Sequence, residues 1–382
     1  MKKTISLLLF LLILLGSAAG CTPAVPAVPT TTAAITTEVP TAVPTTTAPT
    51  TTVPVTTAPT EPEKEPVDNS WAFDTPENHG IDAALLTALH GAVADMEFRS
   101  IVIARDGVII DEYYKDGYDE SYVFGLASCT KSFSGALIGI ALREGQLDSV
   151  EQKLSDFYPE IAEEDGKKDV IIAHFLTHTS GISWSEWAGG TMFRTFTGSD
   201  NWVDFVLNRP MSSTPGTVFN YTTGGSHMLA AVLQKATGQT AFDFARTHLF
   251  APMGMDSVRW RADPQGVTDG GNGISMTARD AAKFGQLYLD GGVWKGQQLI
   301  PADWVAQSVA TQAGGSPGTG TYGYSWWLKS FSGYEVYYAM GHGGQYIFVA
   351  PELNLVAVIT SRFQDTYVPQ YYFNDYIIAA CQ

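Results

Sequence analysis

The sequence predicts an α+β domain in which one antiparallel sheet is built from both ends of the chain. A hairpin signal comes first: residues 101–110 form two β-rich runs around Asp106-Gly107. Strand patterns return only near the end of the chain, and helical patterns dominate the middle, which favours a sheet flanked by terminal helices with an inserted helical lobe. The expected elements are a helix at 81–96, the hairpin, helices within 128–176 and 227–250, strands at 334–340, 346–350 and 355–360, and a helix at 370–380.

The first 21 residues predict an export signal. Lys2 and Lys3 precede an apolar run at 5–15, which is too short for a transmembrane helix of about 20 residues. The end of this segment, Ala18-Ala19-Gly20-Cys21, resembles the lipobox of bacterial lipoproteins, although that motif prefers Leu where this chain has Ala18. The resemblance implies an exported cell-surface or periplasmic lipoprotein that is anchored to the membrane through diacylated Cys21. The alternative is an ordinary signal-peptidase site near a cysteine.

Residues 22–66 predict a disordered tether, and residues 67–382 predict one folded domain. The tether consists mainly of Thr, Pro, Ala and Val, without a pattern that could bury a core. The whole chain has 382 residues and a formal net charge of -17, so phosphate backbones would repel it and nucleic-acid binding is excluded. Three cysteines cannot form the framework of a disulfide scaffold of this length.

Several short patterns resemble catalytic or metal-binding motifs but lack the required context. Gly314-Gly315-Ser316-Pro317-Gly318 has no strand before it and no helix after it, so it predicts a loop. His174 and His178 have metal-ligand spacing, but Thr179-Ser180-Gly181 breaks the helix and favours a helix-end turn. The Gly-rich run 269–273 predicts a turn. We therefore expect no metal and no cofactor.

The remaining candidate is Ser128-Cys129-Thr130-Lys131. A serine and a lysine three residues apart near a helix start share one face, so the lysine can approach the hydroxyl. The helix dipole and burial both disfavour a protonated Lys131 and so adapt it to accept a proton from Ser128. Taken alone, the pattern fits equally well a capping serine beside a solvated lysine.

Three further stretches, in order, make the chain resemble the serine β-lactamase-related family. This family includes class C β-lactamases, β-lactamase-type carboxylesterases and 6-aminohexanoate-dimer hydrolases, and Ser-x-x-Lys is among its catalytic motifs. The resemblance covers 124–360 and implies a β-lactamase/transpeptidase-like fold. The three stretches are Phe175-Leu176-Thr177-His178-Thr179-Ser180-Gly181, Pro215-Gly216-Thr217-Val218-Phe219-Asn220-Tyr221 and Gly341-His342-Gly343-Gly344-Gln345.

The resemblance implies a role for each matching residue. Ser128 would form an acyl-enzyme, and Lys131 and Tyr221 would share the proton transfers, with the identity of the base left open. A phenol beside an ammonium has its ionised form stabilised, so Tyr221 could be a base and then an acid. The backbone N–H groups of Ser128 and Gln345 would form the oxyanion hole. Substrate would lie against the strand edge at His342, Gly343 and Gly344.

Two departures from the family pattern point away from β-lactams. His342 stands where penicillin-directed members have Lys, and Thr223 stands where they have Asn. A largely neutral His is a weaker partner for a substrate carboxylate. Four tryptophans could line an apolar pocket or belong to the core: Trp184, Trp187, Trp326 and Trp327. Cys129 should point away from Ser128 as a small buried side chain, and pairing of Cys129 with Cys381 stays open.

The sequence thus predicts a surface-tethered serine hydrolase that cleaves a small-molecule ester or amide substrate. A β-lactamase or D-amino-acid peptidase with the same serine is the first alternative. A non-catalytic wall-binding or sensor module is the second, and the complete set of Ser128, Lys131 and Tyr221 argues against it.

Overall fold

A computed structural model of the chain describes residues 67–186, 190–315 and 318–382. The predicted signal peptide with Cys21 and the predicted tether lie outside the described residues. So do Trp187 and the central Ser316-Pro317 of the Gly-rich loop. In the described part, no helix has the length and apolar character that a bilayer-spanning segment needs.

A seven-stranded antiparallel sheet forms the centre of the described residues, in the order β2-β1-β12-β11-β10-β9-β8. The first hairpin and the final strands lie side by side in it, because β1 pairs antiparallel with β12. The prediction of one sheet built from both chain ends is therefore confirmed. The strands are β1 (Phe98–Arg105), β2 (Val108–Tyr114), β8 (Thr321–Tyr322), β9 (Trp327–Phe331), β10 (Tyr334–Gly341), β11 (Gln345–Ala350) and β12 (Leu355–Ser361).

The hairpin between β1 and β2 forms for the reason given by the sequence. Asp106 and Gly107 both have positive φ, 53° and 80°, as a two-residue turn with a right-handed strand twist requires. Alternate residues of β1 then reach opposite faces of the sheet. Ile101 and Ile103 join one hydrophobic cluster, and Val102 and Ala104 join the other.

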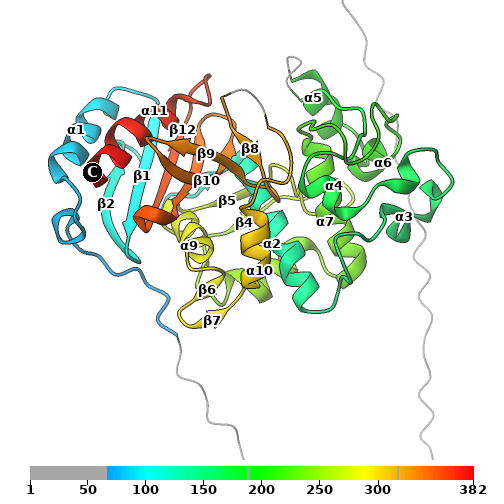
Figure 1. The fold of residues 1–382 in the computed structure, drawn as a ribbon, viewed down its shortest axis with the longest axis horizontal. Coiled ribbons are helices and arrows are strands. Elements are labelled where there is room, and N and C mark those ends of the chain that lie inside the picture. Colours follow the sequence, from blue (N-terminus) through cyan, green and yellow to red (C-terminus); the bar gives the residue numbers. More distant parts are fainter. Residues whose placement is uncertain (1–66, 187–189, 316–317) are drawn as a thin grey trace, which may run out of the picture. The chain divides into compact units, whose positions relative to one another are not determined.

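Helices cover both faces of the sheet (Figure 1). On one face, α1 (Ala83–Val93) packs with the C-terminal helical segment that begins as α11 (Val368–Tyr372). On the other face, α9 (Ala278–Leu289) packs against β1, β11 and β12. The terminal helices were predicted, whereas α9 was not. Its N-cap is Thr277, whose side chain accepts a hydrogen bond from the Asp280 N–H.

The helical lobe occupies the middle of the chain, as predicted (Figure 1). Within it, α7 packs against α2, α4 and α6. Two helices between 191 and 207 were not predicted from the sequence. The helices of this region are α2 (Thr130–Arg143), α3 (Leu154–Phe157), α4 (Ile172–Leu176), α5 (Thr191–Thr197), α6 (Trp202–Leu207), α7 (Thr223–Thr237) and α8 (Ala241–Ala245). A smaller sheet, β3-β5-β4, connects this lobe to the nucleophile candidate through β3 (Phe124–Gly125), β4 (Arg259–Trp260) and β5 (Ile274–Met276).

The close packing of α9 on the sheet predicts a stability difference between two glycine substitutions. A Cβ at Gly285 would lie 2.6 Å from Val356 Cγ1 and 3.0 Å from Ile347 Cγ2, whereas a Cβ at Gly91 on α1 would meet nothing within 4 Å. We expect Gly285→Val to lower the free energy of unfolding by about 1–3 kcal/mol through overpacking. The matched control Gly91→Val should change it by less than about 0.5 kcal/mol. Urea denaturation measures both, and equal effects would contradict the packing argument.

Candidate active site

Ser128 lies in a tight turn between β3 and α2. This turn is the 3-10 helix η2 (Ala127–Cys129), and Ala127 adopts a left-handed φ of 47° directly before the serine. The end of β10 presses against the same turn, since a Cβ at Gly341 would lie 2.2 Å from the Leu126 carbonyl oxygen and 3.1 Å from Ser128 N. Only glycine fits there, and its close approach brings the end of the sheet to the serine backbone.

Lys131 is 1% exposed, and its ammonium has three acceptors from three parts of the chain. Its Nζ donates to Ser128 Oγ at 3.0 Å, to Thr223 Oγ1 at 3.1 Å and to the Gly271 carbonyl at 2.8 Å. The predicted meeting of Ser128 and Lys131 on one helix face is therefore present in the structure. Burial lowers the pKa of Lys131 to about 8, against the opposing effect of the Glu186 and Asp269 carboxylates.

The acceptors around Lys131 determine the direction in which the lone pair of its neutral amine points. The Thr223 hydroxyl donates to Glu186 Oε1 at 2.6 Å, so its oxygen is left to accept from Lys131. The Gly271 carbonyl can only accept. A neutral amine has two N–H donors and one lone pair, and these two acceptors use both donors. The lone pair of neutral Lys131 is thus directed at Ser128 Oγ.

Tyr221 lies just before α7, and its side chain is 5% exposed. Burial raises the pKa of the Tyr221 phenol, although a hydrogen bond with Ser128 opposes this effect. Lys131 Nζ lies over the Tyr221 ring, 4.8 Å from its centroid. Burial therefore opposes the expected stabilisation of an ionised phenol by the ammonium and favours the neutral form of Tyr221.

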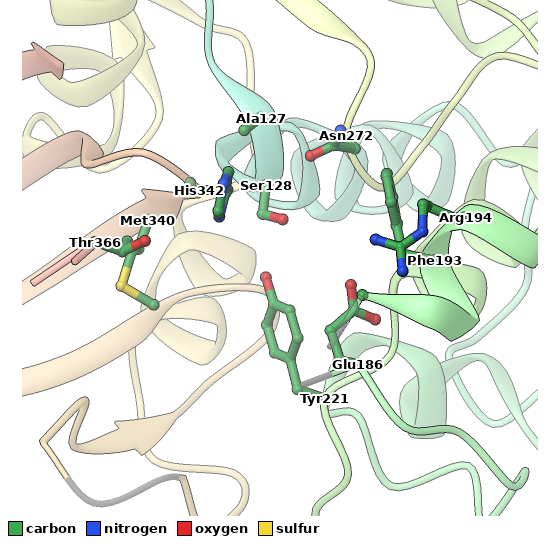
Figure 2. Close-up of a pocket in the computed structure, with 12 residues that line it drawn as sticks. Ala127, Ser128, Glu186, Phe193, Arg194, Tyr221, Asn272, Met340, His342 and Thr366 are labelled. Carbon is green, nitrogen blue, oxygen red and sulfur yellow. The ribbon is translucent and has the colours of Figure 1, made fainter. Parts of the chain in front are cut away.

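Ser128 and Tyr221 open onto a cavity of about 530 Å³ between the sheet and the helical lobe. In Figure 2, His342 and Met340 lie on the sheet side of Ser128, and Glu186, Phe193 and Arg194 lie on the lobe side. The lining is Ala127, Ser128, Glu186, Gly190, Phe193, Arg194, Tyr221, Asn272, Met340, Gly341, His342 and Thr366. Polar side chains thus surround the serine, with apolar surface from Phe193 and Met340.

The hairpin turn between β10 and β11 places its predicted residues differently. His342 lines the cavity and has an exposed side chain, whereas Gly343, Gly344 and Gln345 are buried and are not part of the lining. Gln345 begins β11, and its side chain donates to the Ser361 carbonyl at 2.7 Å and accepts from Arg99 at 2.9 Å. The family pattern implied this stretch as the substrate-facing edge, and of its four residues 342–345 the structure places His342 in the cavity lining.

The tryptophans and cysteines are structural in the described residues. Trp184, Trp326 and Trp327 are at most 6% exposed and belong to the core, and Trp327 stacks on the Tyr221 ring at 5.6 Å between centroids. Cys129 is buried, its Sγ donates to the Gln345 carbonyl, and burial raises its pKa. Cys129 and Cys381 are both free thiols. Cys129 is therefore an inert packing residue, as expected.

Several residues of the site were not identified from the sequence, among them Phe193, Arg194 and Met340 of the cavity lining. Glu186 holds the Thr223 hydroxyl and backbone N–H and accepts from Trp184 Nε1. Gly271 and Asn272 belong to the predicted turn at 269–273, which folds around the Asp269 carboxylate through the N–H groups of both residues. The turn was expected, but the hydrogen bond from Lys131 to its Gly271 carbonyl was not. A carboxylate between Trp184 and Trp187 was the available signal for Glu186.

The described architecture defines the class of this protein. An antiparallel sheet with terminal helices, an inserted helical lobe, and a serine, lysine and tyrosine that meet between them form a β-lactamase/transpeptidase-like fold. The family model described as Beta-lactamase matches residues 89–380. The chain therefore belongs to this family and is a β-lactamase-related hydrolase.

Similar proteins have different named activities. The chain is 26% identical over 319 residues to the 6-aminohexanoate-dimer hydrolase of Paenarthrobacter ureafaciens. The alignment covers 73% of this chain and 78% of that protein. It is 27% identical over 295 residues to penicillin-binding protein 4 of Amycolatopsis lactamdurans. That alignment covers 64% of this chain and 75% of the other protein.

Solved structures share the fold. The octameric penicillin-binding protein homologue from Pyrococcus abyssi has a TM-score of 0.63 at 21% identity and covers 78% of this chain and 76% of its own. The D-stereospecific amidohydrolase from a Streptomyces species also has a TM-score of 0.63, at 16% identity, and covers 78% and 98%. At these identities the likeness establishes the fold alone.

Proposed function

We propose that this protein is a serine hydrolase that cleaves esters or small amides through an acyl-enzyme on Ser128. The observation that carries the proposal is the set of contacts around buried Lys131, which leaves its neutral lone pair for Ser128. With a pKa of about 8, a useful fraction of Lys131 is neutral near physiological pH. A solvated lysine beside a capping serine would have neither property.

In the proposed reaction, Lys131 accepts the proton of Ser128 while Ser128 Oγ attacks the carbonyl carbon of the substrate. The resulting tetrahedral oxyanion needs two preorganised N–H donors. We assign these to Ser128 and His342, in place of Gln345. His342 follows Gly341, which packs on Ser128 N, and His342 lies in the cavity lining.

Tyr221 then acts as the acid for the leaving group. Its buried phenol keeps its proton and is hydrogen-bonded with Ser128, so it lies beside the bond that breaks. The Tyr221 proton passes to the leaving oxygen or nitrogen and releases the alcohol or amine. Lys131 then gives the proton that it took from Ser128 to the Tyr221 phenolate. Water then hydrolyses the acyl-enzyme and restores Ser128.

The cavity supports small substrates with an apolar part. A volume of about 530 Å³ is in the range of small-molecule pockets, and Phe193 and Met340 give it apolar surface. His342 in place of a lysine weakens the recognition of a carboxylate at the sheet side. Esters and small amides without a carboxylate at that position therefore fit best.

Hydrolysis of β-lactams or D-amino-acid peptides is the second candidate. The observation that favours it is Arg194, whose guanidinium reaches the cavity from the lobe side opposite His342 (Figure 2). A guanidinium can pair with a substrate carboxylate in two parallel hydrogen bonds. The hypothesis of ester or small-amide hydrolysis is preferred because Arg194 and His342 lie on opposite sides of Ser128 (Figure 2). His342 stands where penicillin-directed members have their lysine.

We also propose that the protein is exported and anchored to the membrane through lipidated Cys21. The support is the charged start, the short apolar run and the small residues before Cys21. Diacylation would supply the two chains that stable anchoring needs. The Pro-rich tether could then hold the hydrolase domain on the order of 100 Å from the bilayer.

Loss of the nucleophile should abolish both labelling and turnover. We expect Ser128→Ala to remove fluorophosphonate labelling and to lower p-nitrophenyl ester turnover by at least about 10³-fold. Cys129→Ala, which removes the neighbouring thiol, should still be labelled. A chromogenic cephalosporin hydrolysed much faster than the esters would favour the second candidate. A wild type that is not labelled and turns over neither the esters nor the cephalosporin would favour the binding-module alternative.

The pH dependence of acylation should report on Lys131. Acylation needs the neutral amine, so the labelling rate should rise with pH and level off above a midpoint of about 8. The Glu186 charge raises the pKa of Lys131, so Glu186→Gln should move this midpoint to lower pH. Glu163→Gln, on an exposed turn outside the cavity lining, should leave it in place. A midpoint in Glu186→Gln that is unchanged or higher would contradict the assignment of Lys131 as base.

Anchoring depends on one sulfur atom. The N-terminal peptide of the mature protein should begin at Cys21 and carry a diacylglyceryl mass, and Cys21→Ala should remove the protein from the membrane fraction. Mass spectrometry of the fractionated protein measures both. Recovery of a soluble wild-type protein with no acyl mass on Cys21 would disprove the anchor.

A further inference from the structure

His178 contacts each residue of the segment 220–222, which carries Tyr221, although the proposed reaction assigns it no part. Its carbonyl accepts from the Asn220 N–H at 2.7 Å, and its Nδ1 accepts from the Thr222 N–H at 3.3 Å. The imidazole also packs against the Tyr221 ring, with 4.4 Å between centroids. One residue thus holds the backbone on both sides of Tyr221 and contacts its side chain.

The backbone of His178 is adapted to make these contacts. It follows α4 with a left-handed φ of 56°, a conformation in which Asn and His are among the more tolerated residues. The side chain is 1% exposed. This turn directs both the carbonyl and the imidazole toward the segment 220–222, so a single bend in the chain supplies two acceptors.

The hydrogen bond from Thr222 also fixes the protonation of His178. Because Nδ1 accepts, the proton of the neutral ring must be on Nε2. A doubly protonated ring would place an N–H against the Thr222 N–H. Burial and the nearby positive charge of Lys131 hold the pKa of His178 well below its usual range. His178 therefore stays a neutral acceptor and does not itself exchange protons with substrate.

We propose that His178 is a positioning residue that holds the Tyr221 phenol in place for proton donation to the leaving group. The inference rests on the proposed acid role of Tyr221. Without the Nδ1 acceptor, the buried Thr222 N–H has to find another partner, and the turn that carries Tyr221 shifts. Displacement of an acid by about 1 Å is sufficient for a large loss of rate.

Leaving groups separate this role from a purely structural one. An ethyl ester releases a poor leaving group that needs a proton, whereas a p-nitrophenyl ester releases a stable anion that does not. Loss of Tyr221 positioning should therefore slow the first substrate selectively. General loss of folded protein or of Ser128 reactivity would slow both equally.

The experiment compares four variants of the full-length protein on both esters. His178→Leu fills the space without an acceptor. We expect kcat/KM, which reports on acylation, to fall about 10²-fold on the ethyl ester and less than about threefold on the p-nitrophenyl ester of the same acid. His178→Asn keeps an acceptor near the Nδ1 position and tolerates the left-handed backbone, so it should restore ethyl ester turnover to within about fivefold. Thr179→Val, in the same turn, removes only the hydrogen bond to Thr177 and should not discriminate between the esters. Tyr221→Phe provides the reference pattern.

A double variant completes the test. If His178 acts through Tyr221, His178→Leu in the Tyr221→Phe background should cause less than about a threefold further loss on the ethyl ester. Equal losses on both esters, or multiplicative losses in the double variant, would overturn the inference. If Tyr221→Phe itself does not discriminate between leaving groups, the acid role fails and the role of His178 fails with it. Should His178→Leu not fold, His178→Gln, which moves the polar atoms to the Nε2 end, gives the same comparison.

Discussion

The burial of one ammonium group is the constraint on which the rest of this site depends. Moving an unpaired ammonium from water into a protein interior costs several kcal/mol, so Lys131 can be 1% exposed only if acceptors surround it. Those acceptors come from the turn before α2, the first residue of α7 and the loop before β5. The requirement brings together segments that lie 92 and 140 residues from Lys131 in the sequence.

The same requirement explains features that are costly when viewed alone. Ala127 takes a left-handed backbone so that Ser128 can point back over the first turn of α2 toward Lys131. The acidic residue Asp269 is buried because it folds the loop that presents the Gly271 carbonyl, and Arg261 neutralises part of its charge. These local costs are offset by the packed sheet and lobe around them, which hold the site in one arrangement.

The features that could be predicted from the sequence are those that depend on residues close together along the chain. Asp106-Gly107 determined the hairpin, and the spacing of Ser128 and Lys131 placed them on one helix face, because both depend on local geometry. The sequence did not identify Glu186, whose role exists only because Thr223 lies against it in space. The assignment of Gln345 came from the family pattern, which does not contain the hairpin geometry that places His342 in the cavity lining. Sequence reasoning also did not include the burial of the Tyr221 phenol, which opposes the expected stabilisation of its ionised form.

The two proton-carrying groups of the site, Lys131 and Tyr221, have opposite roles in proton transfer. Lys131 is provided with acceptors that leave a lone pair for Ser128, and burial lowers its pKa to about 8. Tyr221 is surrounded by the rings of His178, Tyr322 and Trp327, and burial raises its pKa. A base and an acid can therefore lie within one small site without exchanging roles, since burial favours the neutral form of both groups. The neutral amine of Lys131 can accept a proton, whereas the neutral phenol of Tyr221 can donate one. The same desolvation thus gives the two groups opposite functions, although Lys131 Nζ lies only 4.8 Å from the centroid of the Tyr221 ring.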